Sequence, residues 1–233
     1  MTITYHRDLI QGSDEWLAAR CGLLTASEMK LILTPTLKIA ANDKTRAHVY
    51  EIAAQRITRY VEPTYIGDDM LRGQEDEIIA RGLYADKFGH VDEIGFITND
   101  RWGFTLGYSP DGLVGADGLV EFKSRRQKFQ IQTLVENVAK DAAETIPDDY
   151  VLQCQTAFLV SERKWLDFGS FSGGLHMPII RVFPIPRVQE AILDAASDFE
   201  RQVEIVMQRY KDALASNARL IPTERRVIQE MFT

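Results

Sequence analysis

Apolar residues recur at helical spacing in five stretches of the chain, and each stretch predicts a helix. The expected helices cover residues 43–60, 68–88, 126–143, 148–160 and 186–216. The second is followed by Gly89, which commonly stops a helix, and the fourth follows Pro147, which favours a helix start. Nearer the N-terminus, Ser13 is expected to cap one helical turn and Thr25 or Ser27 another.

The block from Glu93 to Lys123 has a different pattern, with short apolar or alternating runs separated by glycine. These runs read GFIT, WGFTLGYS, DGLVGADG and LVEFKS, which is typical of a β-meander. Two more strands are expected in KWLDFGSFS and MPIIRVF, ahead of the last helix. Strands with helices before and after them predict an α/β or α+β fold, in which helices flank a central mixed β-sheet.

The length of 233 residues fits one globular domain, and no repeat, low-complexity tract or Ser/Gly linker divides it. We expect a single domain over 1–233, with a helical region to about 90, a core sheet over about 93–183 and a C-terminal helix over about 186–216. The absence of a long apolar run and of a secretory signal pattern favours the cytoplasm. Only two cysteines occur, which argues against a disulfide framework, a zinc site or an iron–sulfur cluster.

The formal net charge of −7 argues against a protein that coats nucleic acid, because phosphate affinity comes largely from Lys and Arg. The charge is unevenly distributed, however. Four of the six residues in KSRRQK, from Lys123 to Lys128, are basic, whereas residues 141–149 contain four acids and no base. A basic strip on an acidic body suits an enzyme that concentrates DNA in one cleft. A solvated charge run explains the strip equally well when it is considered alone.

The most informative segment reads SPDGL and is followed, after a predicted turn, by EFK. Glu121 and Lys123 are two residues apart in one strand and therefore point to the same face. A two-residue loop would turn Asp111 to the opposite face. A three-residue loop with Gly118 in a left-handed bulge instead places Asp111 opposite Lys123. The same register sets Leu113 opposite Glu121, and this bulged register is our prediction.

On one face, these residues would form a metal site. The carboxylates of Asp111 and Glu121, with the backbone carbonyl of Phe122, supply the hard oxygen ligands that suit Mg²⁺ or Mn²⁺. Such an ion lowers the pKa of bound water, and Lys123 would orient or deprotonate that water or stabilise the transition state. The bland alternative is a surface hairpin carrying a weak Glu–Lys pair. The preceding Pro-Asp, at this spacing on apolar strands, favours the metal site.

With these motifs the sequence resembles the lambda-exonuclease-like viral recombinases, a branch of the PD-(D/E)xK nucleases. Besides SPDGL and EFK, the blocks QGSDEWLAARCGLLTAS, RGQEDE and DYVLQCQTAFLV follow the family's order, and the resemblance covers about residues 10–170. It implies a restriction-endonuclease-like core. It also implies that Arg20 and Ser27 hold the 5′-phosphate of a DNA end, and that Ser109 takes part in phosphate binding.

Two helices contribute further residues to the site that the resemblance implies. The spacing from Gly73 to Glu77 matches the helix-borne acid of the family, so Glu77 would be catalytic and a possible metal ligand. The residues alone also allow a surface pair between Glu77 and Arg81, and Glu75 is the reserve candidate. Gln153 matches the glutamine near the metal and the nucleophile, although glutamine is also an ordinary exposed helix residue.

The activity that the resemblance implies is Mg²⁺-dependent 5′-to-3′ digestion of one strand of linear double-stranded DNA. Digestion would start at a 5′-phosphorylated end and leave 3′ overhangs for phage-type homologous recombination. The resemblance further implies a homotrimeric ring around the DNA and a single-strand annealing protein as partner. The setting would be a phage or prophage protein in the cytoplasm of a bacterial host.

Contacts with the DNA itself are less closely defined. Which of Arg125, Arg126 and Lys128 contacts the backbone is left open, and Leu71 or Met70 is a candidate wedge for separating the strands. One alternative function is a PD-(D/E)xK endonuclease of restriction or repair type, which shares the core residues but would cut circular DNA. Another is a non-catalytic DNA-end binding module, against which the intact acidic residues and lysine argue.

Overall fold

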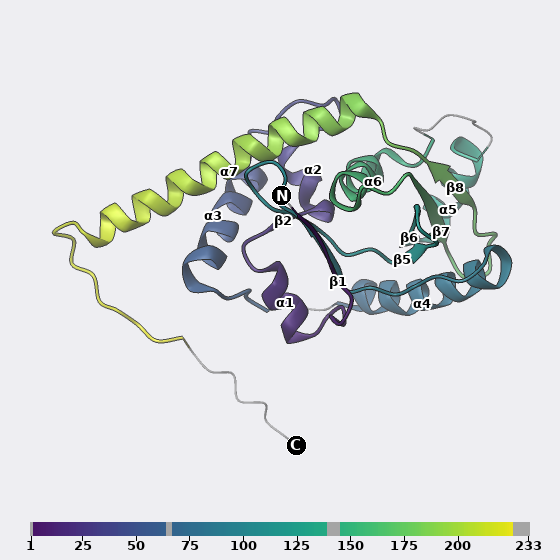
Figure 1. Ribbon diagram of the computed structural model, residues 1–233, viewed down its shortest axis with the longest axis horizontal. Helices are drawn as coiled ribbons and strands as arrows, with labels where there is room; N and C mark the ends of the chain where they lie inside the picture. Colours follow the sequence, from purple (N-terminus) through teal and green to yellow (C-terminus); the bar gives the residue numbers. More distant parts are fainter. Residues whose placement is uncertain (1, 64–66, 139–144, 226–233) are drawn as a thin grey trace, which may run out of the picture.

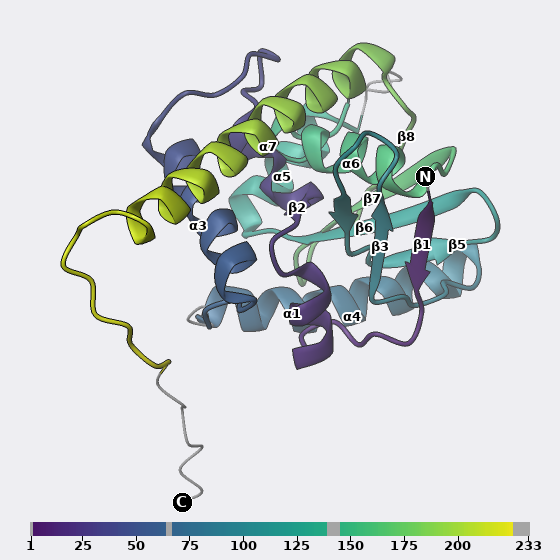
Figure 2. The same cartoon turned by 60° about the vertical axis from the view of Figure 1, so that its left-hand side comes forward.

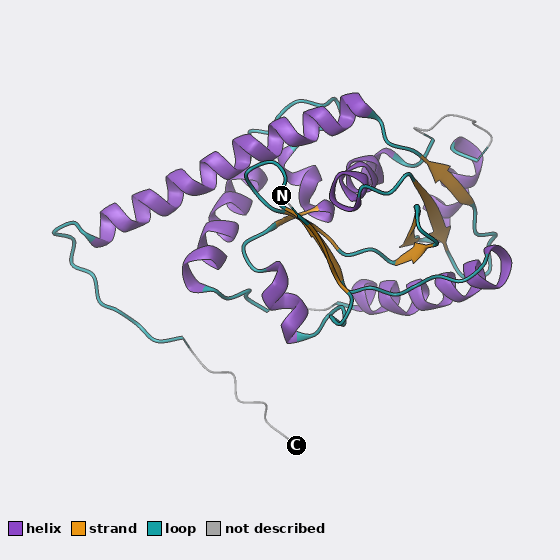
Figure 3. Ribbon diagram, viewed as in Figure 1, coloured by secondary structure: helices purple, strands orange, loops and turns teal. Residues whose placement is uncertain are grey.

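The structure is a computed structural model that describes residues 2–63, 67–138 and 145–225. Its strands form two four-stranded sheets, seen as separate groups in Figure 3. The first sheet has the order β1 (Ile3–His6), β3 (Phe96–Asn99), β4 (Leu106–Tyr108) and β2 (Leu24–Thr25). The second has the order β5 (Gly112–Val114), β6 (Gly118–Ser124), β7 (Trp165–Phe171) and β8 (Ile179–Val182). The pairs β2–β4 and β6–β7 are parallel, which makes both sheets mixed.

Helices account for much of the remaining chain. In chain order they are α1 (Asp14–Arg20), the 3₁₀ turn η1 (Ala26–Glu28), α2 (Met29–Ile32), α3 (Asp43–Thr58), α4 (Asp68–Phe88), α5 (Gln127–Glu136), α6 (Asp148–Ser161) and α7 (Pro186–Leu214). Ser13 caps α1 by accepting a hydrogen bond from the Trp16 amide, as expected, and Thr25 caps η1. Within the described residues, no helix is long and apolar enough to cross a membrane.

The helices expected at 43–60, 68–88, 148–160 and 186–216 are confirmed within two residues at each end. The helix expected over 126–143 is shorter, because α5 ends at Glu136. The next residue, Asn137, has an amide side chain that competes for backbone hydrogen bonds and favours helix ends. Residues 139–143 of that prediction lie outside the described part of the chain.

The β-meander expected between Glu93 and Lys123 is wrong as a single unit. The segment forms two hairpins, β3–β4 and β5–β6, which belong to different sheets. Pro110 lies between them and has no backbone N–H with which to extend a sheet ladder. The chain therefore leaves the first sheet at Ser109 and enters the second at Gly112.

The register predicted for the β5–β6 hairpin is also wrong, although Asp111 and Glu121 lie on the same side of the hairpin as expected. Leu113 pairs with Leu119 rather than with Glu121, a shift of two residues. The left-handed residue is Gly115, with φ of 53°, and not Gly118. Gly118 is extended strand instead, and glycine is needed there because a Cβ would lie 2.2 Å from the ring of Trp165. A shift of two residues preserves the side on which each side chain lies, so Asp111 and Glu121 still meet.

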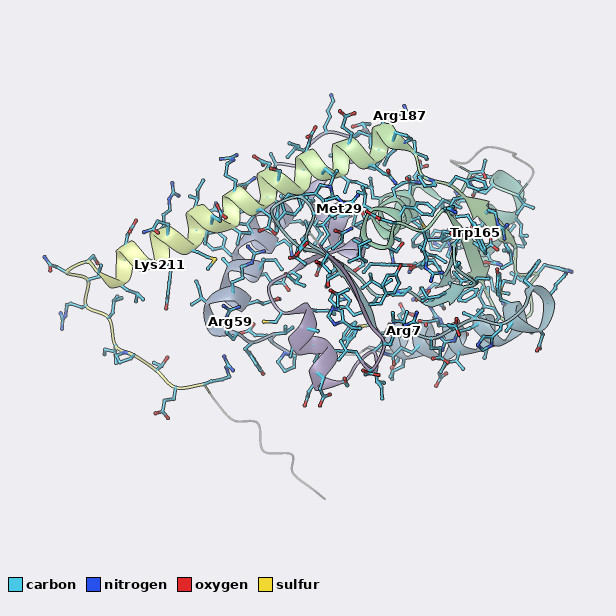
Figure 4. All side chains as sticks on the ribbon, in the orientation of Figure 1. Arg7, Met29, Arg59, Trp165, Arg187 and Lys211 are labelled. Atoms are coloured by element: carbon cyan, nitrogen blue, oxygen red, sulfur yellow. The ribbon has the colours of Figure 1, made fainter. Side chains whose placement is uncertain are left out.

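The second sheet is covered on both faces. Helix α4 lies along one face and α6 lies on the other, where the first sheet also contributes to the main core (Figure 1). Met29, which Figure 4 labels, is fully buried in that core. Under α4, a smaller core contains Ala80, Tyr84, Val120 and Phe122. The site described next lies where these layers meet, at one end of β6.

The long helix α7 crosses α3, and its C-terminal half projects beyond the body of the protein (Figure 2). Its apolar stripe is buried from Val188 to Val203. Farther along, Tyr210 and Leu214 are exposed. The apolar stripe of α7 therefore continues beyond the part of the helix that packs against the protein.

Candidate functional site

The three core residues expected from the sequence lie together. Lys123 Nζ donates to Glu121 Oε1 at 2.5 Å, and both side chains extend from one side of β6. Asp111 directly precedes β5, and its Oδ2 accepts a 2.5 Å hydrogen bond from the backbone amide of Phe122. The side chains of Asp111 and Glu121 are almost completely buried, whereas Lys123 is partly exposed. The carboxylates of Asp111 and Glu121 are thus held close together, and the ammonium of Lys123 lies at the boundary between the core and the surface.

Two further side chains fix the Glu121 carboxylate. Gln153 on α6, expected near the site, donates from Nε2 to Glu121 Oε1 at 2.5 Å. Tyr108 on β4 donates from Oη to Glu121 Oε2 at 2.7 Å. Tyr108 was not expected, because it belongs to the other sheet and no sequence pattern pairs the two strands. Gln155 has a different task, since it bonds Phe183 and Ile185 in the connection to α7.

Burial and charge shift the pKa values of these groups. Burial, reinforced by the neighbouring Glu121, raises the pKa of Asp111 well above its usual range. Burial alone would lower the pKa of Lys123, but the adjacent carboxylates of Glu121 and Asp111 outweigh it and raise that pKa. Burial also raises the pKa of Tyr108 well above its usual value, followed by the effect of Glu121, so its hydroxyl remains a donor. Lys123 therefore stays charged beside a surplus of negative charge.

Glu77, on α4, lies beside this group. Its carboxylate is 29% exposed and accepts a 3.3 Å bond from Arg81 Nη1, so the pair that the residues alone allowed does form. The same nitrogen of Arg81 donates to the backbone carbonyl of Asp111 at 2.9 Å. Burial raises the pKa of Glu77, and Arg81 opposes that rise. Glu75 is exposed, which removes the reason to prefer it over Glu77.

The oxygen donors at this place fit a divalent metal of the Mg²⁺ class. Within residues 2–63, 67–138 and 145–225, no three acidic, histidine or cysteine side chains are close enough to hold an ion by themselves. The donor set is therefore the Asp111 and Glu121 carboxylates, with the Phe122 carbonyl as the expected third ligand. Glu77 lies next to that set rather than within it.

A second cluster, here called the end cluster, consists of Trp16, Arg20, Thr25, Ser27 and Ser109. Arg20 donates to Ser109 Oγ at 3.2 Å and to Thr25 Oγ1 at 3.3 Å, and it stacks 4.4 Å from the centre of the Trp16 ring. Ser27 joins through a 3.4 Å contact with Thr25. Thr25 and Trp16 were not expected as site residues. Burial lowers the pKa of Arg20, yet the group remains a cation at neutral pH.

Three members of the end cluster, Trp16, Arg20 and Thr25, line a cavity of about 960 Å³, and Glu77 lines the same cavity. Of the two wedge candidates, Met70 lines the cavity and Leu71 is not among its lining residues. Both are about half exposed. Ile10 and Ile78, which are more exposed, add to the apolar part of the lining. The cavity therefore combines the partly buried cation of Arg20 with apolar surface at α4.

The basic strip after Lys123 divides into inward and outward residues. Arg125 is half-buried, donates to Tyr150 Oη at 3.1 Å and stacks on that ring. Arg126 is exposed and pairs with Asp69 at 3.0 Å. Lys128 is exposed beside the ring of Phe129. The strip is thus more than a solvated charge run, since one of its cations packs against α6.

Comparison with known proteins gives a family for this arrangement. The family model of the YqaJ-like viral recombinase domain matches residues 15–164. An alkaline exonuclease from Laribacter hongkongensis, LHK-Exo, is 28% identical with a TM-score of 0.73, over 87% of this chain and 98% of that one. Its complex with dAMP gives 29% identity and the same TM-score and coverage.

A phage-related exonuclease from Haemophilus somnus 129PT shares the fold, with a TM-score of 0.53 and 12% identity over 81% of this chain and 96% of that one. A search of curated proteins finds no match. The predicted fold class, mixed sheet flanked by helices, and the predicted resemblance are both confirmed. The chain therefore belongs to the YqaJ-like viral recombinase family and is related to the phage-type alkaline exonucleases.

Proposed function

We propose that this protein is a Mg²⁺-dependent 5′-to-3′ exonuclease, with Mn²⁺ as a possible substitute metal. It digests one strand of linear duplex DNA from a 5′-phosphorylated end and leaves a 3′ overhang for recombination. One observation carries the proposal. Ser109 belongs to the end cluster and Asp111 to the carboxylate pair, so a phosphate-binding group and a metal-binding group lie two residues apart on one segment.

The end cluster binds the terminal phosphate of the strand to be cut. Arg20 supplies a partly buried guanidinium, whose attraction for a phosphate is stronger than at a fully hydrated surface. Ser109 and Ser27 supply hydroxyls that can donate to phosphate oxygens. A 5′-hydroxyl end brings no such charge, and the cluster thus favours phosphorylated ends.

Asp111, Glu121 and the Phe122 carbonyl hold the metal. When bound, the ion supplies an activated water and offsets charge on the scissile phosphate. Lys123 is a fixed cation beside the reacting phosphate and orients the attacking water. Gln153 holds Glu121 in position and can donate to a phosphate oxygen. Glu77 supports this group from α4.

Strand separation and backbone binding involve the surrounding surface. Met70, on the cavity wall, is the preferred wedge against the terminal base pair, with Leu71 as the second candidate. Arg126 and Lys128 are exposed and available to the DNA backbone. Arg125 packs against Tyr150 and adds positive charge without contacting the backbone directly.

Partners of the protein follow from the family. We propose a homotrimeric ring around the DNA, which would keep the substrate bound while each contact stays weak, and a single-strand annealing protein that takes over the 3′ overhang. The existence of a complex of LHK-Exo with dAMP supports DNA as the substrate class. Phage or prophage origin implies action in the cytoplasm of a bacterial host.

The decisive experiment compares linear duplexes that have 5′-phosphate or 5′-hydroxyl ends with a closed circle, each in Mg²⁺ or EDTA. We expect rapid release of mononucleotides only from the phosphorylated linear duplex in Mg²⁺. Cleavage of the circle would identify an endonuclease, and activity in EDTA would refute the metal mechanism. Binding of ends without cleavage in Mg²⁺ would identify a non-catalytic module.

Arg20→Ala tests the end cluster separately. We expect the preference for a phosphorylated end to fall by roughly 10-fold or more, because a charge-assisted contact to phosphate is lost. Arg46→Ala is the matched control, since Arg46 is an exposed arginine on α3. A variant at Arg20 that keeps the full preference would remove this residue from the phosphate site.

A further inference from the structure

The segment from Ser109 to Asp111 connects the two sheets and is held residue by residue from outside. The Ser109 hydroxyl belongs to the end cluster. The carbonyl of Pro110 accepts a 2.8 Å hydrogen bond from Gln11 Nε2, and the carbonyl of Asp111 accepts one of 2.9 Å from Arg81 Nη1. None of these three residues lies within a strand. Their positions therefore depend on side chains from α4 and from the N-terminal segment.

Arg81 has a particular place among these contacts. Its Nη1 bonds both the Asp111 carbonyl and the Glu77 carboxylate, while its Nη2 reaches Glu93 at 3.1 Å. Its side chain is 18% exposed and lines the cavity. One guanidinium thus joins the helix that carries Glu77 to the peptide that carries Asp111.

We propose that Arg81 is a positioning residue for the metal site. It sets the distance and orientation between the Asp111 peptide and Glu77, so that both acids face the reacting phosphate together. This inference rests on the proposed function. A planar guanidinium with several donors in fixed directions suits the task, because it can bond two acceptors without reorientation.

The contact to Asp111 is what separates this role from an ordinary helix pair. A Glu–Arg pair four residues apart occurs on many helix surfaces and positions nothing beyond the helix. Here the same nitrogen also reaches a carbonyl thirty residues away in the chain. Side chains that orient metal ligands in this way typically contribute about 10- to 100-fold to metal affinity or activity.

The test uses the full-length protein and three variants. Arg81→Met keeps the side-chain stem and removes every donor, and Arg81→Lys keeps the charge and a donor group. Glu93→Gln is the control, because it removes only the outer contact of Arg81, to a carboxylate that is 72% exposed. Turnover on phosphorylated linear duplex is measured as kcat and KM. Separately, the Mn²⁺ concentration that half-saturates thermal stabilisation is measured without DNA.

For Arg81→Met, we expect kcat to fall roughly 10- to 100-fold with KM unchanged, and the Mn²⁺ midpoint to rise by a similar factor. Arg81→Lys should recover part of both, and Glu93→Gln should match the wild type. A Mn²⁺ midpoint and kcat within twofold of wild type in Arg81→Met would overturn the inference. Equal losses in Arg81→Lys and Arg81→Met, together with a raised KM and lower melting temperatures, would do the same, because they indicate a purely structural role.

Failure of the proposed function gives a different result. Wild-type protein would then show neither digestion of phosphorylated duplex nor stabilisation by Mn²⁺. The inference alone fails if the wild type shows both and Arg81→Met keeps both.

Discussion

Two carboxylates lie buried on neighbouring strands of the second sheet, and they have opposite surroundings. Glu121 on β6 is 1% exposed, and Asp167 on β7 is 2% exposed. Asp167 pairs in register with Val120, next to Glu121, so the two acids point to opposite faces of the sheet. Glu121 faces α6 and Tyr108, while Asp167 faces α4.

The charges around Asp167 are balanced. Arg181 donates to both oxygens of Asp167, at 2.7 and 2.8 Å, and Tyr84 adds a 2.7 Å hydrogen bond. The hydrogen bond to Asp167 raises the pKa of Arg181, and burial raises that of Tyr84. Arg181 also stacks 3.8 Å from the centre of the ring of Trp165, which Figure 4 labels on β7. One negative charge thus meets one positive charge.

The charges around Glu121 are not balanced in the same way. Glu121 and Asp111 bring two carboxylates, of which Glu121 is bonded to the cation of Lys123 and Asp111 accepts from the Phe122 amide. With both carboxylates ionised, the group would have one negative charge in excess, which burial and the neighbouring Glu121 oppose by raising the pKa of Asp111 and which a divalent cation would offset. The comparison teaches that burial of a carboxylate does not by itself indicate function. An imbalance of buried charge is the more informative feature, because it is costly unless a ligand relieves it.

The largest expected difference concerns catalysis. Lys123→Ala should lower nuclease turnover about 10³-fold, because a fixed cation beside the reacting phosphate is lost. Asp167→Asn should keep turnover per folded molecule within about twofold, since its cluster does not touch the substrate. Single-turnover digestion of a 5′-phosphorylated duplex in Mg²⁺ measures both, with Lys164→Ala as a surface control. Comparable losses in both variants would break the distinction.

Stability should instead be sensitive to the Asp167 group, which turnover does not depend on. Asp167→Asn should lower the free energy of unfolding by about 2–4 kcal/mol, because Arg181 and Tyr84 lose a charged acceptor. Denaturant unfolding measures this, and Asp117→Asn, in an exposed pair with Lys164, should change stability by less than about 0.5 kcal/mol. A loss at Asp167 no larger than at Asp117 would contradict a structural role.

Tyr84→Phe should have a smaller effect of the same sign. It removes the hydroxyl donor to Asp167 but keeps the ring packing against Phe122 and Phe88. We expect a loss of about 1.5 kcal/mol in the free energy of unfolding, because Asp167 keeps both bonds from Arg181. An unchanged unfolding midpoint would show that Arg181 alone satisfies the carboxylate.

The smallest expected change has the opposite sign. Without metal, Asp111→Asn should stabilise the protein by about 1 kcal/mol, because it removes the cost of burying a carboxylate and its repulsion with Glu121. The asparagine oxygen can still accept the bond from the Phe122 amide. Mg²⁺ should then raise the melting temperature of the wild type but not of the variant. Destabilisation of the metal-free variant would refute the charge imbalance.

Much of this picture was accessible from the sequence, for reasons that the residues make plain. Helix α4 was predicted with its bounds because its period is repeated over several turns and Gly89 follows it. Glu121 and Lys123 share a face in any extended strand. The Arg20 and Gln153 positions came from the resemblance to a family, and local pattern alone would not have singled them out.

The two wrong predictions, the hairpin register and the single β-meander, have a common origin. The hairpin has Gly115 in the turn and Gly118 at the start of β6, and by local chemistry either glycine can adopt the left-handed conformation. Gly115 adopts it, whereas Gly118 is extended and packs against the ring of Trp165, which lies on a strand far along the chain. The single meander failed for a similar reason, since local alternation identifies strands but not the sheet to which each belongs.

The sequence by itself did not determine β1 and β2, within the region expected to be helical, but it determined most of the long helices, the strands after residue 93, the shared face of Glu121 and Lys123, and the order of the family's motifs. These depend on short-range periodicity and on residue chemistry, both of which are written in consecutive positions. Only the tertiary structure decided the hairpin register, the contact of Tyr108 with Glu121 and the bridge from Arg81 to Asp111. Those contacts join residues on different elements, so they are set by how whole elements pack, and no local pattern encodes that packing.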